Sequence, residues 1–135
     1  MKKKTVLVID DELDMRTFLS TLFRTKGFKT MAAADGVEGL QMAKQSKPAI
    51  IILDVMMPKE GGIELYRDLK KDPLTRDIPV IMLSGIAKKT FFHSQGVLNT
   101  YTGHKVPEPE AYIEKPPEPD ELLAVAEKIL GKCPM

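Results

Sequence analysis

Five short apolar runs divide the chain, and each is followed within two residues by a polar or charged side chain. The most apolar run is Ala49–Leu53, which contains three isoleucines and stops at Asp54. An uninterrupted run of this length is typical of a strand buried on both faces, as in a parallel sheet covered by helices. The other four predicted strands are Thr5–Ile9, Lys29–Ala33, Val80–Leu83 and Ala111–Glu114.

Between these runs, apolar residues recur at the three- and four-residue spacing of a helix face. The first helix is marked by Met15, Phe18, Leu19, Leu22 and Phe23, and Gly27 can end it. Further helices are expected over Val37–Ala43, over Ile63–Leu69 and from about Pro119 onward, with Leu122, Val125, Ala126 and Ile129 on the buried face of the last. Strands that alternate with helices form βαβ units with parallel pairing. The pattern therefore predicts a single doubly wound α/β domain over residues 1–135.

The composition restricts the classes of function. The 135 residues are 43% hydrophobic and 29% charged, with a net charge of +1, which gives no reason to expect direct binding to nucleic acid or to an anionic membrane. A single cysteine, Cys133, excludes an intrachain disulfide and favours a reducing compartment. No apolar stretch approaches the roughly 20 residues of a membrane span. We expect a cytoplasmic protein.

The segment 86–111, between the fourth and fifth predicted strands, is longer than one helix and its connections require. Lys88–Tyr101 can be helical, although Gly96 weakens that prediction. Residues 102–110 contain Gly103, Pro107 and Pro109 and are expected to form an extended loop.

Chemically useful side chains follow four of the predicted strands. Asp10 and Asp11 follow the first strand, and Asp54, Ser84 and Lys115 lie at the ends of three others. If the strand order is 2-1-3-4-5, the acids converge at the point where the order reverses, which is where such sheets bind ligands. Crowded carboxylates repel one another unless a cation neutralises them, and hard oxygen ligands suit Mg²⁺. With a hydroxyl and an ammonium, this set can receive a phosphoryl group, with the Asp54 carboxylate as nucleophile.

The same residues resemble a known family. Asp10-Asp11, Asp54-Val55-Met56-Met57-Pro58 with Gly61-Gly62, Ser84-Gly85 and Lys115-Pro116 stand in the order and at the strand ends found in the receiver domain of two-component response regulators. The resemblance covers nearly the whole chain and is closest to stand-alone, chemotaxis-regulator-like receivers. It implies a flavodoxin-like fold, a five-stranded parallel sheet in the order 2-1-3-4-5 with helices on both faces.

The resemblance also implies the roles of the acids. Asp54 would be the phosphoacceptor, which takes its phosphoryl group from the phosphohistidine of a histidine kinase or phosphotransfer protein. Asp11 and Asp54 would bind Mg²⁺ directly, together with the backbone carbonyl of Met56, and Asp10 would act through a water molecule. No organic cofactor is expected.

Four other residues acquire roles from the resemblance. Lys115 would pair with Asp54 or with the phosphoryl group, and the Lys115–Pro116 peptide would be cis. Ser84 would move to hydrogen-bond a phosphoryl oxygen, and Tyr112 would be the switch aromatic that follows it. The surface made by the fourth helix, fifth strand and fifth helix would change as a result.

We therefore expect a single-domain response regulator, a signalling phosphoacceptor with self-catalysed phosphorylation and autodephosphorylation and not an enzyme. Because the chain ends at Met135, its output would be contact with a downstream effector protein or phosphorelay, as a monomer or weak homodimer. One alternative is a receiver-like interaction module that is independent of phosphate. Another is a haloacid-dehalogenase-like phosphohydrolase, but such enzymes carry Asp-x-Asp after the first strand, where this chain has adjacent acids.

Overall fold

The structure is a computed structural model that describes residues 4–55, 62–85 and 109–131. These residues form a five-stranded sheet in the order β2-β1-β3-β4-β5, and every neighbouring pair of strands runs parallel. The strands are β1 (Thr5–Ile9), β2 (Lys29–Ala33), β3 (Ile50–Asp54), β4 (Val80–Ser84) and β5 (Ala111–Glu114), and the helices are α1 (Leu13–Thr25), α2 (Gly36–Ser46), α3 (Gly62–Lys71) and α5 (Pro119–Gly131). The predicted fold class and strand order are confirmed.

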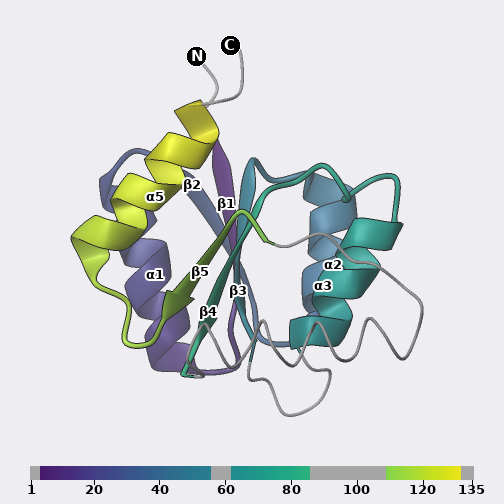
Figure 1. The fold of residues 1–135 in the computed structure, drawn as a ribbon, viewed down its shortest axis with the longest axis horizontal. Coiled ribbons are helices and arrows are strands. Elements are labelled where there is room, and N and C mark those ends of the chain that lie inside the picture. Colours follow the sequence, from purple (N-terminus) through teal and green to yellow (C-terminus); the bar gives the residue numbers. More distant parts are fainter. Residues whose placement is uncertain (1–3, 56–61, 86–108, 132–135) are drawn as a thin grey trace.

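Helices cover both faces of this sheet, with α1 and α5 on one side and α2 and α3 on the other (Figure 1). The strands β3 and β4 are central, and all of their residues are buried. Alternate residues of a strand point to opposite faces, so the sheet supplies two cores. Leu53 and Met82 belong to the core on the α2 and α3 side, whereas Ile52 and Ile81 belong to the other. Burial on both faces explains why the run before Asp54 has no polar interruption.

Local sequence signals set where the helices begin and end. Asp35 caps α2, because its carboxylate accepts a hydrogen bond of 2.9 Å from the backbone N–H of Glu38. The carboxylate of Glu38 accepts a bond of 3.1 Å from the N–H of Ala34 in return. After α1, Gly27 has a φ of +91°, a conformation that glycine adopts without the steric cost of a side chain. The chain therefore leaves α1 where the sequence predicts.

Hydrogen bonds from side chains to backbone carbonyls hold the turn between α3 and β4. The side chain of Lys70 is only 8% exposed, and its ammonium donates to the carbonyls of Arg76 and Ile78 at 3.1 and 3.0 Å. The hydroxyl of Thr75 donates at 2.6 Å to the carbonyl of Leu69. These bonds fix the turn against the end of α3 and thereby fix where β4 enters the sheet.

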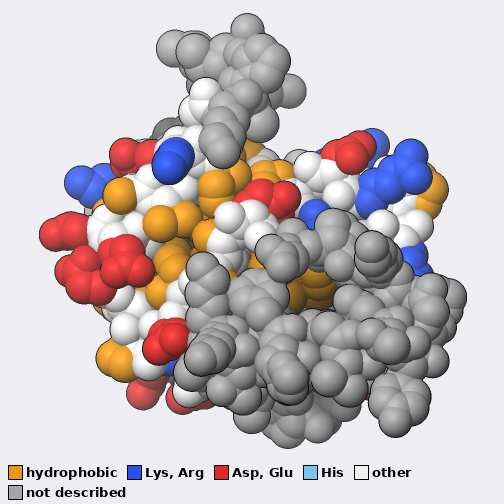
Figure 2. Space-filling view, in the orientation of Figure 1, with side chains coloured by type: hydrophobic (Ala, Val, Ile, Leu, Met, Phe, Trp, Pro, Cys, Tyr) orange, Lys and Arg blue, Asp and Glu red, His pale blue; other side chains and the backbone are white. Residues whose placement is uncertain are grey.

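Charge is distributed unevenly over the molecule, although the net charge is only +1. Each of the described helices has an acidic residue in its first turn and a basic residue in its last turn. Figure 2 shows acidic side chains at the left, over the start of α5, and basic side chains at the upper right, over the ends of α2 and α3. This arrangement complements the helix dipoles, because the N-termini are positive and the C-termini negative.

The beginning and the end of the described chain lie side by side. β1 begins and α5 ends at the top of Figure 1, and the ammonium of Lys4 donates at 3.4 Å to the carbonyl of Leu130. The predicted helix over Lys88–Tyr101 and nearly all of segment 86–111 fall outside the described residues. Among the helices that the structure describes, none is both long enough and apolar enough to cross a membrane.

Candidate functional site

The carboxyl ends of four strands meet at one edge of the sheet, which we call the C-terminal edge. The register pairs Ile9 of β1 with Leu53 of β3, Asp54 with Leu83 of β4, and Ser84 with Glu114 of β5. Residues that directly follow or end these strands are therefore brought to the same edge. They include the acids, the serine and the lysine singled out in the sequence.

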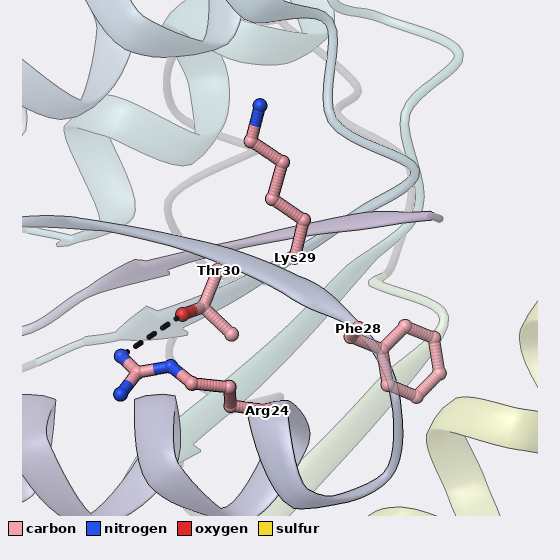
Figure 3. A pocket seen from close by; sticks show the side chains of 4 residues that line it. All are labelled: Arg24, Phe28, Lys29 and Thr30. Carbon is pink, nitrogen blue, oxygen red and sulfur yellow. Dashed lines mark hydrogen bonds between the residues drawn. The ribbon is translucent and has the colours of Figure 1, made fainter. Parts of the chain in front are cut away.

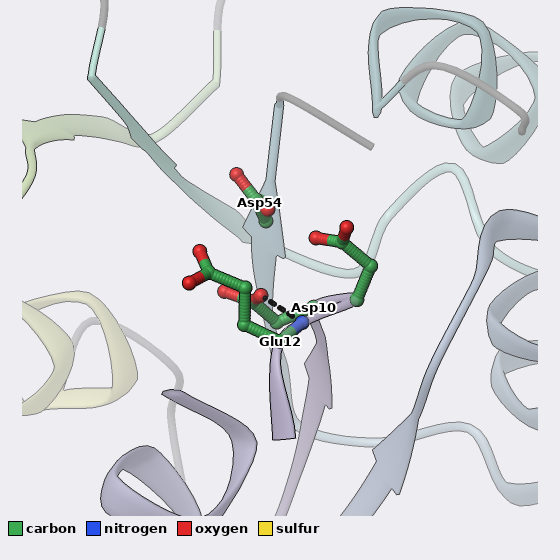
Figure 4. A group of neighbouring side chains, drawn as sticks. Asp10, Glu12 and Asp54 are labelled. Atoms are coloured by element: carbon green, nitrogen blue, oxygen red, sulfur yellow. Dashed lines mark hydrogen bonds between the residues drawn. The ribbon is translucent and has the colours of Figure 1, made fainter. Parts of the chain in front are cut away.

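Four acids form the centre of this edge. The side chains of Asp10 and Asp54 are 1% and 2% exposed, whereas Asp11 and Glu12 are exposed. One carboxylate oxygen of each acid lies within 4.8 Å of the corresponding oxygens of the others. Figure 4 shows Asp10, Glu12 and Asp54 gathered at the ends of β1 and β3. The structure thus brings Asp10, Asp11 and Asp54 together, as the sequence predicts, and adds Glu12.

Backbone contacts hold Asp10 in this position. Its Oδ1 atom accepts a hydrogen bond of 2.9 Å from the N–H of Glu12, and its carbonyl accepts one of 2.8 Å from the guanidinium of Arg16. Its own N–H donates to the carbonyl of Ala33 at 3.1 Å, which continues the pairing of β1 with β2. These bonds stabilise the turn after β1, with the carboxylate of Asp10 directed toward Lys115.

The ammonium of Lys115 neutralises part of the acidic cluster. Its Nζ atom lies 3.2 Å from Asp10, 3.3 Å from Asp54 and 3.5 Å from Glu12. Burial disfavours the charged ammonium, but the nearby carboxylates of Asp54 and Asp10 outweigh this effect and raise the pKa of Lys115. Lys115 is thus a cation at neutral pH. The Lys115–Pro116 peptide is cis, the isomer that the resemblance implies.

The donors at the C-terminal edge fit a magnesium ion. All four acids offer carboxylate oxygens, which are the ligands that Mg²⁺ prefers, and the exposure of Asp11 leaves the cluster open to water. Asp10, Asp11 and Asp54 would hold the ion. Met56, whose carbonyl the sequence proposes as a further ligand, lies outside the described residues.

Ser84 and Tyr112 lie on neighbouring strands and are both buried. Ser84 is fully buried at the end of β4, and its carbonyl accepts a hydrogen bond of 2.7 Å from the N–H of Lys115. Tyr112 on β5 is 8% exposed, and its pKa is raised mainly by burial, against a hydrogen bond with the side chain of Ser84 that lowers it. The two residues proposed as a switch pair are thus hydrogen-bonded in this structure.

The backbone at the start of α3 packs directly against the backbone at the end of β3. The N–H of Gly62 donates to the carbonyl of Val55 at 3.1 Å. A Cβ atom at position 62 would clash with the carbonyl oxygen of Asp54 and would lie 2.6 Å from the Cα of Val55. Only glycine allows this approach without a shift of the backbone that carries Asp54. The sequence shows Gly62 as one half of a Gly-Gly pair, but its contact with Asp54 is visible only in the fold.

Glu12 is the site residue that the sequence reasoning missed. It directly follows Asp10 and Asp11, and this run of three acids was the available signal. An acid at the start of a helix already has an ordinary explanation, because it favours the helix dipole. The contact with Lys115 depends on the position of β5, which the local sequence cannot supply.

A hollow of about 400 Å³ near the start of β2 lacks such a constellation. It is lined by Arg24, Phe28, Lys29 and Thr30. Figure 3 shows that the side chain of Lys29 points away from the guanidinium of Arg24, which donates at 3.4 Å to the hydroxyl of Thr30. The two cations therefore do not converge on a ligand.

The fold and the site define a class: a doubly wound α/β domain with an acidic cluster and a lysine at the C-terminal edge of its sheet. The family model of the response regulator receiver domain matches residues 6–127. The chain belongs to this family.

Similar proteins agree with this assignment. The chain is 35% identical over 132 residues to the phosphate regulon transcriptional regulatory protein PhoB of Pseudomonas aeruginosa, covering 98% of this chain and 54% of that protein. It is 36% identical over 129 residues to the alkaline phosphatase synthesis transcriptional regulatory protein PhoP of Bacillus subtilis, covering 96% and 49%. The chain therefore spans about half the length of these relatives.

A solved structure of similar shape is a putative response regulator from Chloroflexus aurantiacus. Its TM-score is 0.77 at 29% identity, with coverage of 97% of this chain and all of the other. A CheY-like receiver domain protein from Methanospirillum hungatei has a TM-score of 0.80 at 24% identity, covering 97% of this chain and 96% of that one. At that identity the second comparison supports the fold alone.

Proposed function

We propose that this chain accepts a phosphoryl group on Asp54 from the phosphohistidine of a histidine kinase or phosphotransfer protein. The observation that carries the proposal is the environment of Asp54. Its carboxylate is 2% exposed at the end of the central strand, lies 3.3 Å from the ammonium of Lys115, and shares a cluster with three other acids. A buried nucleophile beside a fixed cation suits phosphoryl transfer.

In the proposed step, a carboxylate oxygen of Asp54 attacks the phosphorus atom and forms a P–O bond. The P–N bond to the histidine breaks, and the imidazole nitrogen keeps the electron pair. The other ring nitrogen of the phosphohistidine carries a proton, so the ring leaves as a neutral imidazole and not as an anion. The product is an acyl phosphate on Asp54 and a neutral histidine on the donor. Lys115 stabilises the negative charge that develops on the phosphoryl oxygens. Mg²⁺, when bound by Asp10, Asp11 and Asp54, would supply further neutralisation of the same charge.

We also propose that the added phosphoryl group changes the surface formed by β5 and α5, with the fourth helix that the sequence predicts. The hydrogen bond between Ser84 and Tyr112 supports this, because it links the site to β5. The chain would act in the cytoplasm as a signalling phosphoacceptor rather than an enzyme. The printed names of two relatives include transcriptional regulation, but those proteins are about twice as long, so the proposal stops at a change of protein contacts.

The proposal is tested by intact-mass measurement after incubation with phosphoramidate, with and without Mg²⁺. We expect the wild type to gain one phosphoryl group only with Mg²⁺, and Asp54→Ala to gain none. Asp14→Ala is the matched control, because Asp14 is an exposed acid in the first turn of α1 and lies outside the acidic cluster. A wild type that gains no mass under any condition would favour the phosphate-independent interaction module.

A further inference from the structure

Three acids surround the ammonium of Lys115. An ammonium group has three N–H donors. Asp10, Asp54 and Glu12 lie 3.2, 3.3 and 3.5 Å from the Nζ atom. A phosphoryl oxygen that approaches Lys115 therefore competes with these carboxylates for the ammonium.

The three acids differ in how easily their carboxylates can move away from the ammonium of Lys115. Asp10 is 1% exposed, and its carboxylate is held by the N–H of Glu12. Asp54 is 2% exposed and is itself the group that accepts the phosphoryl group under the proposed function. The side chain of Glu12 is 64% exposed, so its carboxylate can turn into water without being buried unpaired.

The backbone position of Glu12 is one at which side chains often cap a helix. Glu12 is the N-cap residue of α1, with extended backbone angles (φ −90°, ψ 121°). Asp, Asn and Ser at this position accept a hydrogen bond from the first turn of the helix. Glu12 makes no such side-chain bond, and within the described part of the chain its carboxylate contacts Lys115 instead.

We propose that Glu12 is a positioning residue of this site. Its carboxylate contacts the ammonium of Lys115 in the unphosphorylated protein, and a phosphoryl oxygen displaces it from that contact. The inference rests on the proposed function of Asp54. Glu12 then opposes binding of the phosphoryl group in two ways, because it competes for the ammonium and because its charge repels the group.

The test is the affinity for beryllium fluoride, a phosphoryl mimic, at saturating Mg²⁺. Calorimetry suits this chain, which has no tryptophan for a fluorescence signal. We expect Glu12→Gln to bind about two- to fivefold more tightly than the wild type, which is the range that an exposed ion pair provides. Asp14→Asn is the control, because it removes the same charge from the next exposed acid of α1. We expect less than about a twofold change for it.

A second variant separates the effect of side-chain length at position 12 from the effect of its charge. Glu12→Asp keeps the negative charge on a side chain that is one methylene shorter, and aspartate is a favoured N-cap. Its carboxylate is expected to accept a hydrogen bond from the first turn of α1 and to leave Lys115. This variant should therefore bind beryllium fluoride more tightly than the wild type and should also unfold at a higher temperature.

Three outcomes would overturn the inference. Equal affinity in wild type and Glu12→Gln would mean that Glu12 does not compete. An equal gain in Glu12→Gln and Asp14→Asn would mean that only overall charge matters. Weaker binding by Glu12→Gln would mean that Glu12 supports the phosphoryl group. If the wild type itself bound no beryllium fluoride with Mg²⁺, the proposed function would fail, and this inference would fall with it.

Discussion

Lys115 is the residue on which the charge balance of the site depends. Asp10 and Asp54 are buried acids, and a buried charge without a partner is costly. The ammonium of Lys115 lies within 3.3 Å of both. Removing it would leave these two buried carboxylates close together without their cation.

We expect Lys115→Met to lower the free energy of unfolding at pH 7 by roughly 1–3 kcal/mol, the cost of leaving buried charged groups unpaired. The pKa of Lys115 is raised above its ordinary value of 10.5, so the stabilisation that it provides is complete below that value and is lost as pH rises through the folded pKa. Urea unfolding of both proteins between about pH 7 and about pH 11 should show a constant difference that shrinks only at the alkaline end. Lys128→Met, at an exposed residue of α5, should show no such difference at any pH.

Single residues also show how far the sequence could predict this site. Asp10, Asp54, Ser84 and Lys115 could be placed because each follows or ends an apolar run, and parallel strands end at one edge. Glu12 and Lys70 could not be placed in this way. Both are charged residues at helix ends. Glu12 contacts Lys115, which is distant in the sequence, and Lys70 donates to the turn that folds back against its own helix. Helical periodicity identifies a buried face but not such contacts.

At the level of secondary-structure elements, the backbones of α3 and β3 come into close contact. Gly62 begins α3 against the backbone of Asp54 and Val55, so the position of the helix and that of the proposed phosphoacceptor depend on each other. The strands themselves were predictable, because short apolar runs with polar ends have few alternatives. The close packing of α3 against β3 was not predictable from the sequence. A glycine pair indicates a turn whether or not another backbone lies against it.

We expect Gly62→Ala to destabilise the protein by roughly 1–3 kcal/mol, as overpacking does where backbone atoms must move. Gly85, which directly follows β4, is the matched control, since a Cβ atom there would meet no atom of the described residues within 4 Å. Gly85→Ala should therefore be close to neutral. Urea unfolding of the two variants measures the difference. Equal stability of both would show that the junction is loose enough to accept a methyl group.

Across the whole molecule, the site exists only when the sheet is complete. Asp10 and Lys115 are 105 positions apart in the sequence, yet their side chains form an ion pair. The unfolded chain keeps Asp10, Asp11 and Glu12 adjacent but separates them from Asp54 and Lys115. A cation that binds these acids therefore binds the native state in preference, and it stabilises that state by mass action.

We expect Mg²⁺ to raise the thermal unfolding midpoint, by an amount that corresponds to about 2.7 kcal/mol when free Mg²⁺ is a hundred times its dissociation constant. Removal of the metal with a chelator should reverse the shift. Asp11→Asn should weaken the response, because it removes the exposed acid of the cluster, whereas Asp68→Asn on α3 should not. A midpoint in wild type that does not depend on Mg²⁺ would argue against a metal site at the C-terminal edge.

The hydrogen bond between Lys4 and Leu130 has a practical consequence for engineering. The first strand starts beside the point where the last helix stops, at the edge of the sheet away from Asp54 (Figure 1). A short linker could join these points in a circular permutant, because termini that lie close together tolerate such rearrangement. A reporter domain fused at either point would stand clear of the acidic cluster. Any influence of such a fusion on Asp54 would have to pass through the sheet rather than by direct contact.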